Sequence, residues 1–190
     1  MNDPFLQAEP RTEAAEETLF AGKHLHFVRR ENWEFAARAH AVGAVALIAV
    51  TPEDELLLTE QYRPPVGRRV IDVPAGLVGD EASKGDEDWR DAARRELFEE
   101  TGYACDALEP LFTGPTSAGL SSELVLFVRA RGVKKTGEGG GVMNERIHVR
   151  LAPLDGVEAW LREEEAAGKL IDPKVFAALF FTGRDKAGRS

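Results

Sequence analysis

The sequence is poor in cysteine and in long apolar segments. Cys105 is its single cysteine, so neither an intramolecular disulfide nor a cysteine metal site can form within the chain. This favours a reducing compartment, and we expect a cytoplasmic protein. The longest apolar run, residues 41–50, is far too short to span a bilayer, so we expect no membrane association.

An excess of basic residues is also lacking. The formal net charge is −9, from 33 acidic and 24 basic residues. Because this charge repels a nucleic-acid backbone, we expect no nucleic-acid partner. A small phosphorylated substrate is still compatible, since a bound metal can neutralise one local site. Residues 1–20 lack the basic and apolar regions of a signal peptide, and we expect residues 1–17 to form a flexible N-terminus.

The remaining composition is ordinary for a soluble globular protein, and 190 residues are enough for one sizeable core, or for one domain plus a small appendage. Short alternating stretches in residues 18–40 predict an antiparallel β hairpin ahead of the main domain. The main domain is expected at residues 41–190. Residues 41–50 predict a strand buried on both faces, and residues 55–62 predict its hairpin partner.

Further elements follow from apolar spacing and from glycine and proline. A short strand is expected around Val70 and Val73, ended by Pro74 and Gly76. Residues 134–141 predict a glycine-rich mobile loop. The other expected strands are residues 108–112, 123–130 and 146–151, and the expected helices are residues 88–101, 155–167 and 172–183.

The helix at residues 88–101 carries an unusual acidic face. Glu96, Glu99 and Glu100 have i, i+3 and i+4 spacing, so they share one side of the helix and repel one another. They also lie toward the C-terminal end, where the helix dipole disfavours anions. A hard divalent cation would reverse this penalty, since carboxylate oxygens are suitable ligands for Mg²⁺ or Mn²⁺. A merely solubilising acidic face is the alternative.

This segment resembles the Nudix box. The family pattern has a glycine, five residues, a glutamate and seven residues before its Arg-Glu core. Here Glu87 is followed, after seven residues, by Arg95-Glu96-Leu97-Phe98-Glu99-Glu100-Thr101-Gly102-Tyr103. Glu81 occupies the position of the family glycine. Gly76 is the expected equivalent, which implies a five-residue insertion within residues 77–86.

The resemblance extends to the subgroup that hydrolyses ADP-ribose and nucleotide sugars. The similar segments are residues 60–64, 72–76, 117–123 and 172–174. It implies an α+β Nudix fold, in which a mixed β-sheet is sandwiched between helices. It also implies a homodimer in which an N-terminal β segment, here residues 18–40, takes part. The subgroup usually has glutamate where Asp72 stands, and ADP-ribose enzymes tend to have proline where Ala118 stands, so the preferred X group stays open.

The resemblance also assigns roles to single residues. It implies metal ligands at Glu96, Glu99 and Glu100, with the Ala75 carbonyl, and Glu87 acting through water. Arg95 is expected to orient Glu99, and Glu145, with Glu138 as the alternative, to be the general base. The residues implied to contact substrate are Arg63, Asp72, Gly76 and Gly119.

Several functions fit these features. The leading expectation is a metal-dependent enzyme that cleaves the pyrophosphate of a nucleoside diphosphate linked to X, with ADP-ribose or another nucleotide sugar as substrate. A Nudix hydrolase of dinucleoside polyphosphates or coenzyme A, and a non-catalytic nucleotide-binding module, are the alternatives. The retained helix carboxylates argue against the last.

Overall fold

The computed structural model describes residues 14–79, 87–141 and 146–187, with side chains described up to residue 183. The central sheet has the strand order β7-β4-β10-β9, with β10 parallel to β4 and the other neighbours antiparallel. Every residue of β4 is buried, which confirms the predicted strand with two buried faces. The four strands are β4 (Gly43–Ala49), β7 (Ala75–Val78), β9 (Ala107–Pro115) and β10 (Leu124–Arg131).

A second mixed sheet has the order β12-β5-β6-β13. The predicted hairpin between residues 41–50 and 55–62 is wrong, because β4 and β5 separate into different sheets. A single bridge, Val50 to Leu56, joins them beyond a turn in which Asp54 has a positive φ of 60°. The strands are β5 (Glu55–Arg63), β6 (Arg68–Asp72), β12 (His148–Pro153) and β13 (Leu170–Ile171), and a 3₁₀ turn, η1 (Pro64–Val66), links β5 to β6.

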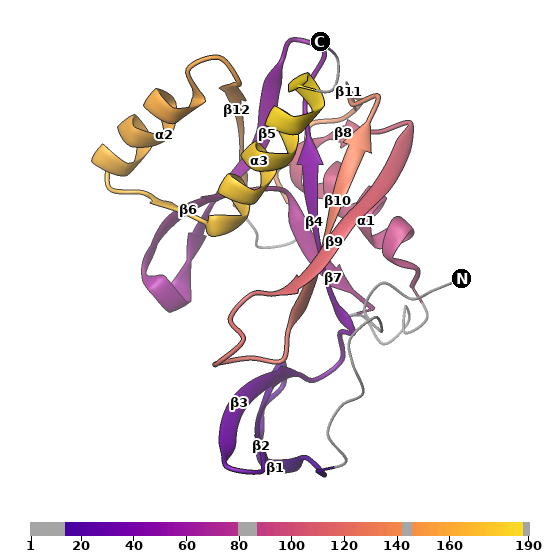
Figure 1. Ribbon diagram of the computed structural model, residues 1–190, viewed down its shortest axis with the longest axis vertical. Helices are drawn as coiled ribbons and strands as arrows, with labels where there is room; N and C mark the ends of the chain where they lie inside the picture. The colour runs from indigo at the N-terminus through magenta and orange to yellow at the C-terminus, as the bar shows by residue number, and fades with distance from the viewer. Residues whose placement is uncertain (1–13, 80–86, 142–145, 188–190) are drawn as a thin grey trace.

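Helices cover both faces of the central sheet (Figure 1). The helix α1 (Trp89–Thr101) packs on one face and contributes Leu97 to a core with Val45 and Leu47. The helices α2 (Val157–Ala166) and α3 (Pro173–Ala187) contribute to the opposite core with Ala46 and Ile48. Alternate residues of β4 therefore enter two cores, as strand geometry requires. This arrangement agrees with the expected α+β organisation, in which mixed β-sheets lie between helices.

The helix predictions were closest for α1. Asp88 caps its N-terminus through the amide of Arg90, and Gly102 ends it with a left-handed φ of 70°. By contrast, α3 continues to Ala187, past the predicted end near Gly183. A glycine inside a helix costs only about 1 kcal/mol relative to alanine, so it need not end one.

The N-terminal segment forms a three-stranded antiparallel sheet, one strand more than predicted. It lies apart from the helix-covered domain, at the bottom of Figure 1. The amide of Ala36 donates to the Leu120 carbonyl at 2.9 Å, and the Ser122 amide donates to the Ala36 carbonyl at 3.0 Å. The sheet is thereby attached to the loop before β10. Its strands are β1 (Glu17–Ala21), β2 (Leu25–Arg30) and β3 (Trp33–Arg38).

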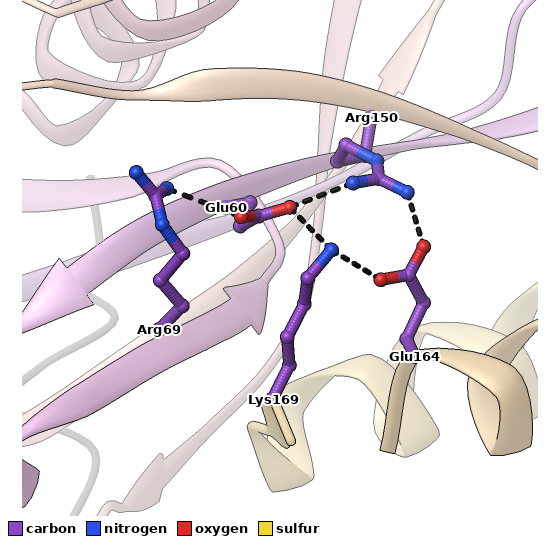
Figure 2. A network of polar contacts seen from close by, with 5 residues as sticks. All are labelled: Glu60, Arg69, Arg150, Glu164 and Lys169. Atoms are coloured by element: carbon purple, nitrogen blue, oxygen red, sulfur yellow. Dashed lines mark hydrogen bonds and ion pairs between the residues drawn. The ribbon is translucent and has the colours of Figure 1, made fainter. Parts of the chain in front are cut away.

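A buried ion network attaches α2 to the second sheet (Figure 2). Glu60 on β5 accepts from Arg69 at 3.1 Å, from Arg150 at 2.7 Å and from Lys169 at 2.8 Å. Glu164 on α2 pairs with the same Arg150 and Lys169. Burial favours the neutral acid, but the bond to Lys169 and the three cationic charges outweigh it and lower the pKa of Glu60. Glu60 therefore has a structural role within the residue 60–64 motif.

Candidate active site

Strand β7 places a short backbone segment against the acidic face of α1. The amide of Ala75 donates to Glu100 Oε2 at 3.0 Å. The next residue, Gly76, has no side chain, and the Glu96 carboxylate fills the space beside its Cα. The sequence did not predict β7, because Pro74 and Gly76 are typical of strand ends. The antiparallel pairing of β7 with β4 nevertheless continues through Ala75 and Gly76.

Arg95 gathers three carboxylates on the outer side of this contact. Its guanidinium donates to both oxygens of Glu87, at 3.0 and 3.1 Å, and to Glu96 at 2.7 Å. The predicted pair with Glu99 is present but longer, at 3.4 Å. A further bond reaches the Leu77 carbonyl at 3.2 Å. The bond to Glu87 and the charges of Glu96 and Glu87 raise the pKa of Arg95 against the effect of burial, so Arg95 stays charged.

Glu100 is the most buried of the helix carboxylates, with 7% of its surface exposed. Burial raises the pKa of Glu100 well above its usual range, and the charges of Glu96 and Asp72 raise it further. The amide of Ala75 and the charge of Arg63 act in the opposite direction without cancelling this effect. Glu100, Glu96 and Asp72 thus form a local concentration of negative charge that a cation would stabilise.

Positive side chains line the same cleft as these carboxylates, which has a volume of about 290 Å³. Arg63 ends β5, and Lys174 lies in the first turn of α3. Lys174 contacts the buried Asp72 at 3.1 Å, and Arg63 lies 3.9 Å from the same carboxylate oxygen. The cleft is therefore lined by carboxylates from α1 and by paired charges from β5, β6 and α3, as suits an anionic ligand carrying a metal.

The predicted glycine-rich mobile loop is instead bonded to the end of α1. Gly140 and Gly141 donate their amides to the carbonyls of Glu100 and Glu99, each at 2.9 Å. Lys135 Nζ donates to the Thr101 carbonyl at 2.7 Å. These donors satisfy carbonyls that a helix end leaves unpaired and offset its negative dipole. They therefore lower the local penalty on the acidic face. The first two residues of this segment form β11 (Lys134–Lys135), which pairs with β8 (Tyr103–Ala104) directly after α1.

The structure brings most of the predicted site residues together. Glu87, Arg95 and Glu99 join the cleft residues through the Arg95 contacts. Gly119 lies in an exposed loop outside the lining of the cleft, as far as the chain is described. Glu145 lies outside the described residues, and the alternative base, Glu138, is exposed. The predicted residues that line the cleft are Arg63, Asp72, Ala75, Gly76, Glu96 and Glu100.

Sequence reasoning missed the four further cleft residues that carry a charged or amide side chain: Arg38, Gln61, Glu123 and Lys174. Gln61, Glu123 and Lys174 lie within the segments that resemble the nucleotide-sugar subgroup, and this resemblance was the signal that could have identified them. Arg38 lies outside those segments. It comes from β3 and reaches the cleft through its ion pair with Glu123, at 2.6 Å. The N-terminal sheet therefore contributes to the cleft of its own chain.

Within the described ranges, no group of three or more His, Cys, Asp or Glu side chains is arranged to hold a metal ion. The carboxylates accept hydrogen bonds from Arg95 and from the Ala75 amide instead. Their chemistry still fits a hard divalent cation, because carboxylate oxygens are the preferred ligands and Glu96, Glu100 and Asp72 crowd like charges together.

No helix in the described part of the chain is long and apolar enough to cross a membrane.

Comparison with known proteins identifies the family of this chain. The family model of the NUDIX domain matches residues 39–179. The chain therefore belongs to the Nudix family and is a Nudix hydrolase, which confirms the resemblance seen in residues 87–103.

Two curated relatives and one solved structure are similar to this chain. The "Methanol dehydrogenase activator" of Bacillus methanolicus is 35% identical over 138 residues, which cover 72% of this chain and 70% of that protein. The "ADP-ribose pyrophosphatase" of Bacillus subtilis (strain 168) is 35% identical over 117 residues, covering 58% and 60% of the two chains. The structure titled "Crystal structure of ADP compounds hydrolase" superimposes with a TM-score of 0.69 at 19% identity, over 96% of this chain and 99% of that one, and supports the fold.

Proposed function

We propose that this protein hydrolyses the pyrophosphate bond of a nucleoside diphosphate linked to X, with ADP-ribose or another nucleotide sugar as substrate. The observation that carries this proposal is the cleft that Glu96, Glu100 and Arg63 line together. An acidic wall that binds a cation and an arginine that binds phosphate match a polyanionic substrate. The relative named ADP-ribose pyrophosphatase supports ADP-ribose as the first compound to test.

The proposed cofactor is Mg²⁺ or Mn²⁺. Glu96, Glu99 and Glu100 would hold it, with the Ala75 backbone and, through water, Glu87. When bound, such an ion neutralises phosphate charge and lowers the pKa of a coordinated water. Arg95 keeps Glu87, Glu96 and Glu99 on one side of α1, because its guanidinium donates to all three.

The proposed reaction adds water across one P–O bond of the pyrophosphate. The water oxygen bonds to one phosphorus, the bridging oxygen leaves with the other phosphate, and a carboxylate accepts the proton. The products are a nucleoside monophosphate and a phosphorylated X. Glu145 stays our proposed base, with Glu138 as the alternative. Arg63 is proposed to bind a substrate phosphate, since arginine can donate two parallel hydrogen bonds to it.

A substrate panel tests this proposal. ADP-ribose, other nucleotide sugars, dinucleoside polyphosphates and coenzyme A are incubated with the protein and Mg²⁺ or Mn²⁺, and the products are separated by chromatography. We expect a nucleoside monophosphate from ADP-ribose or another nucleotide sugar. Preferential cleavage of a dinucleotide or of coenzyme A would reassign the substrate. Intact compounds throughout, with tight nucleotide binding, would indicate a non-catalytic module.

A pair of variants tests whether any hydrolytic activity depends on the carboxylates of α1. Glu99→Gln removes one proposed ligand whose side chain is 31% exposed, so the fold is expected to survive. Its activity should fall at least about 100-fold, since even outer-shell changes around metals cost up to that much. The matched control is Glu165→Gln on the exposed face of α2, which should retain wild-type activity. Equal activity of the two variants would remove Glu99 from the metal site.

We also propose a cytoplasmic homodimer in which the N-terminal sheet takes part. Phe20 and Trp33 are 68% and 64% exposed, which is unusual for large apolar side chains on a free surface. Cys105 is a free, buried thiol, as suits a reducing compartment. Light scattering after gel filtration should give twice the 20.8 kDa chain mass, and a monomer mass would contradict the dimer.

A further inference from the structure

Lys174 is a cleft residue to which neither the resemblance nor the comparisons assign a role. Its ammonium group contacts Asp72 Oδ2 at 3.1 Å and Asp172 Oδ1 at 2.8 Å. Its side chain is 19% exposed and lines the cleft. An ammonium group has three donors. Lys174 therefore joins two carboxylates, those of Asp72 and Asp172, at the edge of the cleft.

The backbone fixes where Lys174 stands. The amide of Asp172 donates to the Ile71 carbonyl at 2.9 Å, directly beside the parallel pairing of Ile171 with Ile71. The Asp172 side chain then accepts from the amide of Lys174 at 2.9 Å and caps the start of α3. Because Asp172 is bonded to β6 and caps α3, the first turn of α3 has a defined position next to Asp72.

Asp72 connects Lys174 to Arg63. Asp72 is 5% exposed, and its Oδ1 accepts from the Val73 amide at 2.8 Å. Its Oδ2 lies near both cations, with Lys174 closer at 3.1 Å and Arg63 at 3.9 Å. The Arg63 side chain is 45% exposed. Lys174 thus provides the close contact to this buried carboxylate, and Arg63 is held loosely and remains open to the cleft.

We propose that Lys174 is a positioning residue that neutralises Asp72 and so keeps Arg63 available to a substrate phosphate. This proposal rests on the proposed function. A buried carboxylate without a partner is strongly unfavourable, so loss of Lys174 leaves Asp72 to recruit the nearest cation. Arg63 is that cation. It closes onto Asp72 and is withdrawn from the cleft, and substrate binding weakens although the reacting groups on α1 are unchanged.

The test in solution is a double-mutant cycle of Lys174→Met and Arg63→Gln. Hydrolysis of ADP-ribose is measured at saturating Mg²⁺. Lys174→Met should raise KM roughly 10-fold with kcat changed less than about 3-fold, the pattern of lost uniform binding. In the Arg63→Gln background, Lys174→Met should change KM by less than about 2-fold, because both changes remove one interaction. Lys174→Arg, which keeps the cation, should restore most of the wild-type KM.

Other outcomes overturn the proposal. Additive effects on KM would mean that Lys174 contacts substrate by itself. An unchanged KM would make its contact with Asp72 purely structural. If Lys174→Met does not fold, Lys174→Gln gives the same comparison, because its amide keeps a donor but no charge.

A crystal structure of the Lys174 variant separates this inference from the proposed function. We expect the Arg63 guanidinium to move from 3.9 Å into direct hydrogen-bond distance of Asp72. This readout needs no substrate. If Arg63 stays in place, the positioning role is wrong even if the enzyme is active. If Arg63 moves but the wild-type protein cleaves no compound of the panel, the proposed function fails alone.

Discussion

The carboxylate of Glu96 occupies the space that a side chain on Gly76 would need. A Cβ atom on Gly76 would lie 1.8 Å from Glu96 Cδ and 2.0 Å from Oε1. The obstructing atoms are the far end of a flexible side chain, which can move away without disturbing the backbone. Gly76 therefore constrains where one carboxylate lies more than it constrains the fold.

Gly76→Ala should accordingly separate activity from stability. Glu96 must leave its position, and a displacement of about 1 Å at a catalytic group can cost about 100-fold in rate. We expect a loss of that order in kcat/KM with a nearly unchanged melting temperature. The matched control is Gly183→Ala, where nothing lies within 4 Å of the added carbon. Unfolding of Gly76→Ala would show that the contact is needed for the fold itself.

The ion network around Glu60 should be essential to stability. Glu60→Gln leaves Arg69, Arg150 and Lys169 with fewer opposing charges in a site where the Glu60 side chain is 7% exposed. Breaking a buried pair in this way costs about 3 kcal/mol of unfolding free energy. The measurement is the urea midpoint at constant m-value.

The exposed pair of Glu158 and Arg162 provides the control for this network. The two groups are 3.8 Å apart with side chains 83% and 78% exposed. Glu158→Gln should change stability by less than about 0.5 kcal/mol, because exposed pairs contribute little. Equal effects of Glu60→Gln and Glu158→Gln would contradict the role assigned to the network.

Asp72 should make stability depend on pH in the metal-free protein. Burial, and then the charge of Asp172, raises the pKa of Asp72 from 3.8 to about 6, although Lys174 acts against this rise. The folded state therefore binds more protons than the unfolded state between these two values, and the associated stability is lost as the pH rises through about 6. From pH 4.5 to pH 7 the loss amounts to about 2 kcal/mol.

The comparison is between wild type and Asp72→Asn, unfolded in urea at both pH values with a chelator present. The wild type should lose more stability than the variant over this interval. If the two proteins show the same difference between pH 4.5 and pH 7, the pKa of Asp72 is not raised as described.

Local patterns were sufficient to predict α1, because its cap, apolar stripe and terminal glycine lie within 15 residues. Strand β4 was equally clear, since all its residues are apolar or glycine. The separation of β4 from β5 was not predictable in this way, because pairing partners depend on the whole sheet. Strand β7 was missed because Pro74 and Gly76 look like chain breaks, although the carbonyl of Pro74 accepts from Leu47 at 2.8 Å.

In the candidate site, too, residues that depend on local spacing were predictable and residues that depend on long-range pairing were not. The acidic face of α1 could be predicted from helical spacing alone. Lys174 could not, since it reaches Asp72 only through the parallel pairing of β13 with β6, about a hundred residues apart in sequence. The contact of Arg38 with Glu123 likewise depends on how the N-terminal sheet docks.

The bonds from the glycine-rich segment to α1 have a consequence for deuterium uptake. The amides of Gly140 and Gly141 donate to the carbonyls of Glu100 and Glu99 at 2.9 Å, and those of Thr136 and Gly137 donate to the carbonyl of the capping residue Gly102 at 2.8 Å. A glycine-rich stretch ordinarily exchanges with solvent almost at once, whereas these amides can exchange only when the end of α1 opens. Their exchange rates, followed by mass spectrometry, would therefore report on opening at the carboxylate end of α1 without a probe on the helix.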